Sequence, residues 1–177
     1  MKLSAFAKAF RQQYYVTCWT MNEHEDISMW DRYTSSSKSV AIYTSYKNLR
    51  SILPRYVDMG VVRYIDYATT RLPTLNMYHR IMHKRVEFSV ESEVRGVAFE
   101  NLPDELGGLD LRGNRFAKSD DPSFHVFAPE VNLKQLIEGI VTHPKSASSF
   151  REQMQKLVEC LGLPTPIESV LAAKPLF

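Results

Sequence analysis

The chain has 177 residues, of which 44% are hydrophobic and 11% aromatic, enough to bury a core in a single globular domain. The 22 Lys and Arg residues against 20 Asp and Glu residues give a net charge of only +2, so composition offers no support for nucleic-acid binding. No apolar run approaches the roughly 20 residues that cross a bilayer, and charges at Lys2, Lys8 and Arg11 are unlike a signal peptide. Cys18 and Cys160 lie in segments expected to be a buried strand and a buried helix, so we expect no disulfide framework and a cytoplasmic location.

The first half of the chain alternates short helices and strands. Helical spacing of apolar residues predicts an N-terminal helix over residues 1–13. Aromatic and β-branched residues predict strands over 14–20, 39–45 and 59–67. Asn22 and Glu25 are spaced as a capping box for a helix that ends near Tyr33, and further helices are predicted over 46–53, closed by Pro54, and over 74–84.

The second half contains the longest predicted strand, 87–99, followed by a loop or loose hairpin at 101–123 that is rich in Pro, Gly, Asp and Asn. Strands over 123–128 and 139–143, a helical turn at 133–137 and a helix over 146–160 that ends at Gly162 complete the chain. We therefore expect an α+β fold in which residues 1–177 form one domain, with a mixed or mostly antiparallel central sheet and flanking helices.

The strand predicted at 87–99 carries the strongest candidate site. Residues two apart on a strand share a face, and these would lie on one side: Glu87, Ser89, Glu91, Glu93 and Arg95. That side would face solvent in an ordinary half-buried strand. Alternatively, Glu91 and Glu93, about 7 Å apart, would raise each other's proton affinity, with Arg95 offsetting the effect. In a cleft, such a trio could position a ribose hydroxyl and stabilise positive charge developing on a sugar.

Two other polar groups have both a structural and a functional interpretation. Asn22 and its neighbours at a helix start are explained by capping, or they could receive an anion. His79 and His83 would share a helix face as zinc ligands do, but no third ligand is apparent and the basic neighbours Lys84 and Arg85 repel a cation, so we expect no metal site. The region 79–85 could instead receive a phosphate, or form a solvated helix face.

Three short patterns together resemble a known family. They are Cys18-Trp19-x-Met21-Asn22-Glu23-x-Glu25, Met29-Trp30-x-x-Tyr33 and Glu91-x-Glu93-x-Arg95. The combination resembles bacterial domain-of-unknown-function family 2971, over Tyr14 to about Leu171. The resemblance implies a related fold and no particular activity. Because many members carry a further N-terminal segment, it also implies that this chain is a short form.

A second resemblance implies an activity. Glu91-Ser92-Glu93 is similar to the Glu-x-Glu strand motif of ADP-ribosyltransferases, in which the second glutamate stabilises the oxocarbenium-like state of the NAD ribose. Tyr43-Thr44-Ser45 resembles the Ser-Thr-Ser motif of that superfamily and precedes Glu-x-Glu along the chain, as it does there. The superfamily's Arg or His on an earlier strand has no counterpart here.

The sequence thus leaves two classes of function open. In the first, a nucleotide-handling enzyme uses Glu91 and Glu93 in catalysis and holds NAD with Tyr43, Ser45, Trp19, Asn22 and Arg95. In the second, the chain binds a partner protein or a small ligand without chemistry. The two classes differ in whether the two glutamates face a pocket, and the oligomeric state is open in both.

Overall fold

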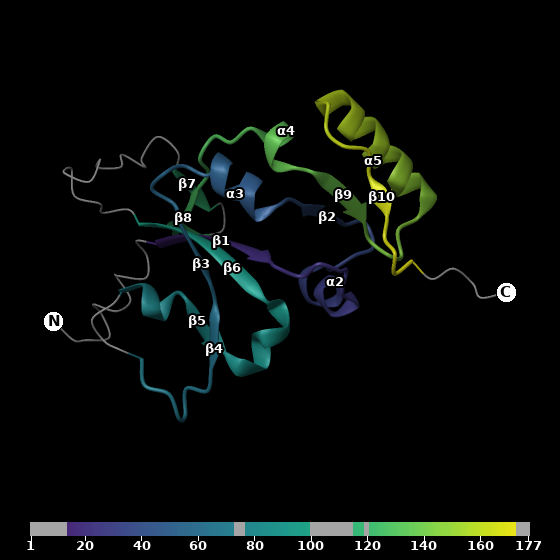
Figure 1. Ribbon diagram of the computed structural model, residues 1–177. Coiled ribbons are helices and arrows are strands. Elements are labelled where there is room, and N and C mark those ends of the chain that lie inside the picture. Colours follow the sequence, from purple (N-terminus) through teal and green to yellow (C-terminus); the bar gives the residue numbers. More distant parts are fainter. Residues whose placement is uncertain (1–13, 73–76, 100–114, 119–120, 173–177) are drawn as a thin grey trace. The chain divides into compact units, whose positions relative to one another are not determined.

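The computed structural model describes residues 14–72, 77–99, 115–118 and 121–172, with the backbone alone described for Met77, 115–118 and 121–127. Helices and strands are intermixed and most strand pairs are antiparallel, which confirms the predicted α+β class (Figure 1). The chain divides into two compact units. Unit 1 comprises Met1–Met21 and Pro54–Glu130, and unit 2 comprises Asn22–Leu53 and Val131–Phe177. The organisation of residues 1–177 as one domain stays a prediction.

Unit 1 is built on an antiparallel sheet with the strand order β1-β6-β3. Its strands are β1 (Tyr14–Thr20), β6 (Glu93–Phe99) and β3 (Asp58–Val61). The central strand β6 supplies three core side chains: Val94, Val97 and Ala98. Gly96 lets the neighbouring strands approach, since a Cβ there would lie 2.8 Å from Cγ2 of Thr17 and 3.1 Å from Sδ of Met59.

Shorter elements complete unit 1. Strand β4 (Arg63–Ile65) pairs in parallel with β5 (His83–Arg85), and two 3-10 helices, η1 (Met77–Arg80) and η2 (Val86–Glu91), flank β5 in the chain. Strands β7 (Arg115–Lys118) and β8 (Asp121–Phe127) form an antiparallel pair whose register shifts near Lys118.

Unit 2 contains a sheet with the strand order β10-β9-β2, formed by β10 (Ile167–Glu168), β9 (Gly139–Thr142) and β2 (Val40–Tyr43). Its helices are α2 (Ile27–Tyr33), α3 (Tyr46–Ile52), α4 (Leu133–Leu136) and α5 (Ser148–Leu161). All four residues of β9 are buried, and each helix contributes at least one buried apolar residue: Trp30, Leu49, Leu136 and Val158. The sheet centre and the helices therefore form the core of this unit.

Several predicted elements are confirmed. Strand β1 has the predicted bounds, α3 ends directly before Leu53 and Pro54, and α4 and β9 differ from prediction by a residue. Helix α5 ends where Gly162 adopts a φ of 63°, a left-handed conformation in which glycine carries no Cβ penalty.

Two predicted elements in unit 1 are wrong. The strand expected over 59–67 is two strands, because Val62 donates its N–H to the Glu93 carbonyl (2.9 Å) whereas Arg63 donates to the Met82 carbonyl (2.8 Å), so the chain changes partner strand. The prediction of one helix over 74–84 is also wrong for residues 77–84, which the structure describes. Residues 77–80 form η1, and His83 already belongs to β5 because it pairs with Arg63.

The predicted capping box is wrong as well. Asp26 is the N-cap of α2, and its Oδ1 accepts the Ser28 N–H at 2.8 Å. Glu25 instead accepts hydrogen bonds from the Ser169 hydroxyl and from the Val170 N–H (3.2 Å). These partners are 144 and 145 residues away in the sequence, so local sequence patterns do not predict them.

Four further expectations concern the cysteines, the N-terminal helix, the 101–123 loop and membrane spans. Cys18 and Cys160 are free and exposed, so the expectation that both are buried is wrong. The N-terminal helix lies outside the described residues, as does the loop up to residue 114, whereas β7 and the start of β8 occupy part of its remainder. Within the described ranges, every helix is too short or too polar to cross a membrane.

Candidate functional site

Glu91 and Glu93 do not lie on one strand, so the face predicted for residues 87–95 is wrong. Glu91 ends η2 and Glu93 begins β6, with Ser92 between them at a φ of 39°, in the left-handed region. Hydrogen bonds close this turn on both sides of Ser92, whose N–H donates to the Ser89 carbonyl (3.1 Å) and whose carbonyl accepts from the Met21 N–H (2.9 Å). The period-two pattern of the sequence therefore stops at Ser92.

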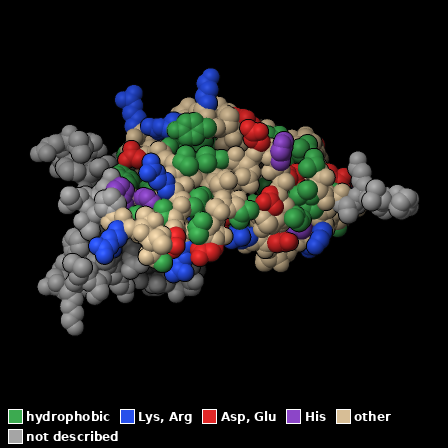
Figure 2. Space-filling view, turned by 60° about the horizontal axis from the view of Figure 1, so that its bottom comes forward, with side chains coloured by type: hydrophobic (Ala, Val, Ile, Leu, Met, Phe, Trp, Pro, Cys, Tyr) green, Lys and Arg blue, Asp and Glu red, His purple; other side chains and the backbone are tan. Residues whose placement is uncertain are grey.

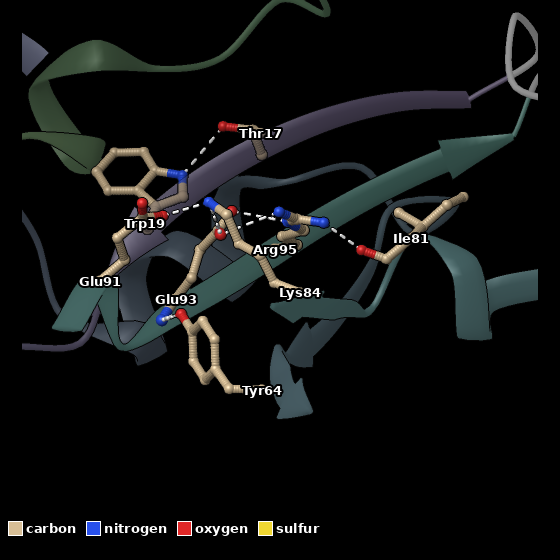
Figure 3. Close-up of polar contacts among 8 residues, drawn as sticks. All are labelled: Thr17, Trp19, Tyr64, Ile81, Lys84, Glu91, Glu93 and Arg95. Atoms are coloured by element: carbon tan, nitrogen blue, oxygen red, sulfur yellow. Dashed lines mark hydrogen bonds and ion pairs between the residues drawn. The ribbon is translucent and has the colours of Figure 1, made fainter. Parts of the chain in front are cut away.

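The parallel pair of β4 and β5 brings two polar groups to Glu93. Tyr64 and Lys84 are register partners on these strands. The backbone N–H of Glu93 donates to the Tyr64 hydroxyl at 2.8 Å, and the Lys84 Nζ lies 3.3 Å from Oε2 of Glu93. The same ammonium bonds Oε2 of Glu91, so Lys84 bridges both carboxylates (Figure 3).

Arg95 holds the Glu93 carboxylate from the other side. Its Nε donates to Oε1 at 2.7 Å and its Nη2 donates to Oε2 at 3.0 Å, an arrangement with two donor nitrogens that fixes the planes of both groups. Its Nη1 donates to the Ile81 carbonyl (Figure 3). We refer to Lys84, Glu91, Glu93 and Arg95 as the ionic cluster.

Both carboxylates of the ionic cluster are buried, Glu91 with 3% and Glu93 with 4% of its surface exposed. The expectation that they lie on a solvated face is therefore wrong. Burial raises the pKa of Glu93, but hydrogen bonds from Arg95 and Cys18 and nearby positive charge bring that pKa below its usual value. The rise expected from Glu91 is thus wrong for Glu93, whereas the offset expected from Arg95 is present, and Glu93 is ionised at neutral pH.

The sequence did not identify Cys18 as a neighbour of these charges. Cys18 lies opposite Arg95 in the β1–β6 register, so the two side chains share a face of the sheet. Although Cys18 as a residue is exposed, its thiol is partly desolvated. This desolvation, followed by a hydrogen bond and charge repulsion from Glu93, raises the pKa of the Cys18 thiol to about 11. The Cys18 thiol is therefore protonated at neutral pH and can donate a hydrogen bond. Its position beside Glu93 follows from the pairing of β1 with β6, which are distant in sequence.

Trp19 does not join the ionic cluster. Its register partner on β6 is Val94, which faces away from Glu93 and Arg95 because neighbouring strand residues alternate between faces. Its indole Nε1 donates to the Thr17 hydroxyl at 3.1 Å (Figure 3). Trp19 therefore does not face Glu93 or Arg95, and its predicted role in holding NAD stays a prediction.

The remaining residues expected to hold NAD lie in unit 2. Ser45 is the N-cap of α3, and its hydroxyl donates to Oε1 of Glu138 at 2.6 Å. The Tyr43 ring lies so close to Gly139 that a Cβ there would be 2.1 Å from Cζ. Asn22 is exposed, in the segment before α2. None of these three residues belongs to the unit that contains Glu91 and Glu93.

The two histidines occupy different elements rather than one helix face. His79 lies in η1 and His83 in β5, with ring centroids 5.4 Å apart and planes at 87°. Nδ1 of His83 lies 2.6 Å from the His79 carbonyl oxygen, so this ring nitrogen is in a hydrogen bond with the backbone. Among the residues that the structure describes, no group of three or more His, Cys, Asp or Glu side chains could hold a metal ion.

Comparison with known proteins identifies no relative of this chain from which a function could be inferred. No family model, curated protein or solved structure matches the chain. Membership of domain-of-unknown-function family 2971 stays a prediction.

Proposed function

We propose that this chain is a non-catalytic binding module that contacts a partner protein through η2 of unit 1. The observation that carries the proposal is the exposure of three apolar side chains within Val86–Glu91, beside the buried carboxylate of Glu91. Glu91 is 3% exposed, whereas Val86, Phe88 and Val90 are 50%, 36% and 40% exposed. Glu87 and Ser89 of η2 are exposed as well, so apolar and polar side chains are mixed on this segment. Exposed apolar side chains grouped among polar ones are typical of a contact surface.

The ionic cluster supports this surface directly. Lys84 bonds the Glu91 carboxylate at the end of η2, and its Nζ also lies 5.1 Å from the centre of the Phe88 ring, within the range of a cation–π contact. Figure 2 shows hydrophobic side chains scattered among acidic and basic ones over one face of the molecule as a whole. Aromatic and aliphatic contacts within a polar rim are the usual composition of a protein interface.

The hydrogen bonds of Glu93 argue against a catalytic role for it. Both carboxylate oxygens accept a hydrogen bond from the Arg95 guanidinium, and Oε2 also faces Lys84. A sugar cation stabilised by Glu93 would have to compete with two resident cations for a buried carboxylate. The same bonds explain why Glu93 tolerates burial without any ligand.

Thermal unfolding with millimolar NAD, and with ATP and ADP-ribose as controls, separates the two functions. A ligand at about 100 times its dissociation constant stabilises a protein by roughly 2.7 kcal/mol, which corresponds to about 5–10 °C for a chain of this size. We expect no such shift. A shift with NAD that disappears in Glu93→Gln would overturn the proposal and favour an NAD-handling enzyme.

Site-specific crosslinking in the native host tests the partner surface itself. A photoreactive p-benzoylphenylalanine replaces Phe88 in one variant and Tyr67 in a matched control, because Tyr67 is an aromatic residue of the same unit and is 47% exposed. We expect an adduct with a second protein from position 88 and none from position 67. Absence of an adduct at position 88, or equal adducts at both, would contradict the proposed surface.

A further inference from the structure

Strand β2 forms one edge of the sheet in unit 2. All four of its residues are exposed, with Val40 at 37%, Ile42 at 42% and Tyr43 at 49%, whereas all four residues of its neighbour β9 are buried. The segment Val40–Tyr43 contains no charge, proline or glycine, the residue types that usually protect an exposed edge. The sheet thus presents an apolar edge strand.

The register identifies which backbone groups this edge offers. The Ser39 carbonyl accepts from the His143 N–H (3.0 Å) and the Tyr43 carbonyl accepts from the Glu138 N–H (3.1 Å), so the odd-numbered residues direct their backbone groups toward β9. Because these directions alternate along an antiparallel strand, the N–H and C=O groups of Val40 and Ile42 point away from β9. The outer edge therefore carries two donors and two acceptors from apolar residues.

The two ends of β2 carry opposite charges. Lys38, which is exposed, precedes the strand. At the other end, the exposed Glu138 is held by the Ser45 backbone N–H at 3.0 Å and by the Ser45 hydroxyl at 2.6 Å. An antiparallel copy of the strand would place each positive end beside a negative end.

We propose that β2 pairs with β2 of a second copy of this chain, antiparallel about a twofold axis. In this arrangement Val40 faces Ile42 of the second copy, and each exchanges both backbone hydrogen bonds with the other. Lys38 of each copy lies toward the end of β2 that carries Glu138 in the other. The two sheets then continue as one, and this interface in unit 2 does not depend on the binding surface proposed for unit 1.

Self-pairing accounts for the edge better than an unrelated peptide does. One symmetric register satisfies the outward groups of both Val40 and Ile42, and the same register brings the opposite end charges together. A peptide from another protein would need the same apolar and charge pattern along its own chain to pair antiparallel in this register. A second copy already carries that pattern.

Sedimentation analysis and hydrogen exchange of the wild-type chain test the pairing without any substitution. We expect a monomer–dimer equilibrium, and amide protection at Val40 and Ile42 that increases with protein concentration. A chain that stays monomeric at all concentrations tested would overturn the proposal. Protection of these amides in the monomer would also overturn it, since another segment of the same chain would then cover the edge.

Charge substitutions on the edge test the register. The double variant Val40→Lys with Ile42→Lys places like charges opposite each other, so we expect dimerisation to weaken at least about tenfold. The variant Val40→Glu with Ile42→Lys places opposite charges face to face across the axis and should recover much of that loss. Val61→Lys, on an edge strand of unit 1, should leave dimerisation unchanged. Equal weakening in both double variants would overturn the proposed register, and circular dichroism verifies that each variant is folded.

Discussion

Replacing Arg95 with methionine should destabilise unit 1 selectively. The substitution removes the two hydrogen bonds that Arg95 donates to the Glu93 carboxylate and its bond to the Ile81 carbonyl, while it keeps a long apolar side chain in place. The side chains of Arg95 and Glu93 are only 15% and 6% exposed, so Glu93 would remain a buried carboxylate with fewer partners. That situation is far more costly than the loss of a surface ion pair.

The magnitude follows from what Glu93 retains. Removing one member of a buried pair costs about 3–5 kcal/mol, and the lower end applies because the Lys84 Nζ remains 3.3 Å from Oε2. A loss of about 3 kcal/mol corresponds to a fall in Tm of roughly 6–12 °C for a chain of this length. The double variant Arg95→Met with Glu93→Gln should recover part of the loss, since the buried charge is then absent.

The two tryptophans allow each unit to be followed separately. Trp19 belongs to unit 1 and Trp30 to unit 2, so denaturant unfolding of 5-fluorotryptophan-labelled protein can be read by ¹⁹F NMR from one signal in each unit. The matched control is Arg151→Met, which removes an exposed pair with Glu168 and a hydrogen bond to the Ser146 carbonyl (3.0 Å), and which should cost about 1–2 kcal/mol. If Arg95→Met costs no more than this control at the Trp19 signal, the ionic cluster does not stabilise unit 1 as argued.

Four further predictions follow from single contacts. Because the pKa of Glu93 is below its usual 4.5, the stability that its charge contributes is complete above pH 4.5 and is lost as the pH falls toward the folded-state pKa. In Glu93→Gln the free energy of unfolding should therefore depend less steeply on pH in the acid range, and an unchanged slope would contradict this. Gly96→Ala should cost about 2 kcal/mol in denaturant unfolding, and more than Gly60→Ala, whose new Cβ meets only a flexible methionine end; equal losses would refute this packing argument. Cys18, with a pKa of about 11 rather than 9.0, should react with iodoacetamide roughly 100-fold more slowly than an ordinary thiol. Cys18 should react faster in Glu93→Gln than in the wild-type chain, and equal rates in the two would contradict the contact between Cys18 and Glu93. Ser45→Ala should cost about 1 kcal/mol and reduce amide protection in α3, whereas unchanged exchange would show that the cap contributes little.

Elements whose signals are local were predictable from the sequence. The aromatic and β-branched run at Tyr14–Thr20 forms β1, and Gly162 marks the end of α5 because a left-handed residue is needed there. The α3 boundary follows from Pro54, which disfavours a helical residue before it. In each case the residues that decide the structure lie within the element or beside it.

The candidate site was predictable only in part. The residue types at Glu93 and Arg95 correctly indicated a pair of charges that interact, whereas Glu91 is bound by Lys84. Their arrangement depended on the left-handed turn at Ser92, a residue type that carries no strong preference for that conformation. The participation of Lys84 depended on pairing between β4 and β5, which local patterns do not encode.

The division of the chain has a consequence for the order in which it folds. Unit 2 is formed by two segments separated by Pro54–Glu130, and its Ser45–Glu138 bond spans 93 residues. Closing a flexible loop of that length costs roughly 4 kcal/mol of chain entropy, and the cost falls when the intervening segment is already compact. During synthesis, every strand that the structure describes in unit 1 has emerged by residue 127, whereas β9, α5 and β10 come later. We therefore expect unit 1 to form first, which makes the chain between the two segments of unit 2 compact and lowers the entropy cost of joining them.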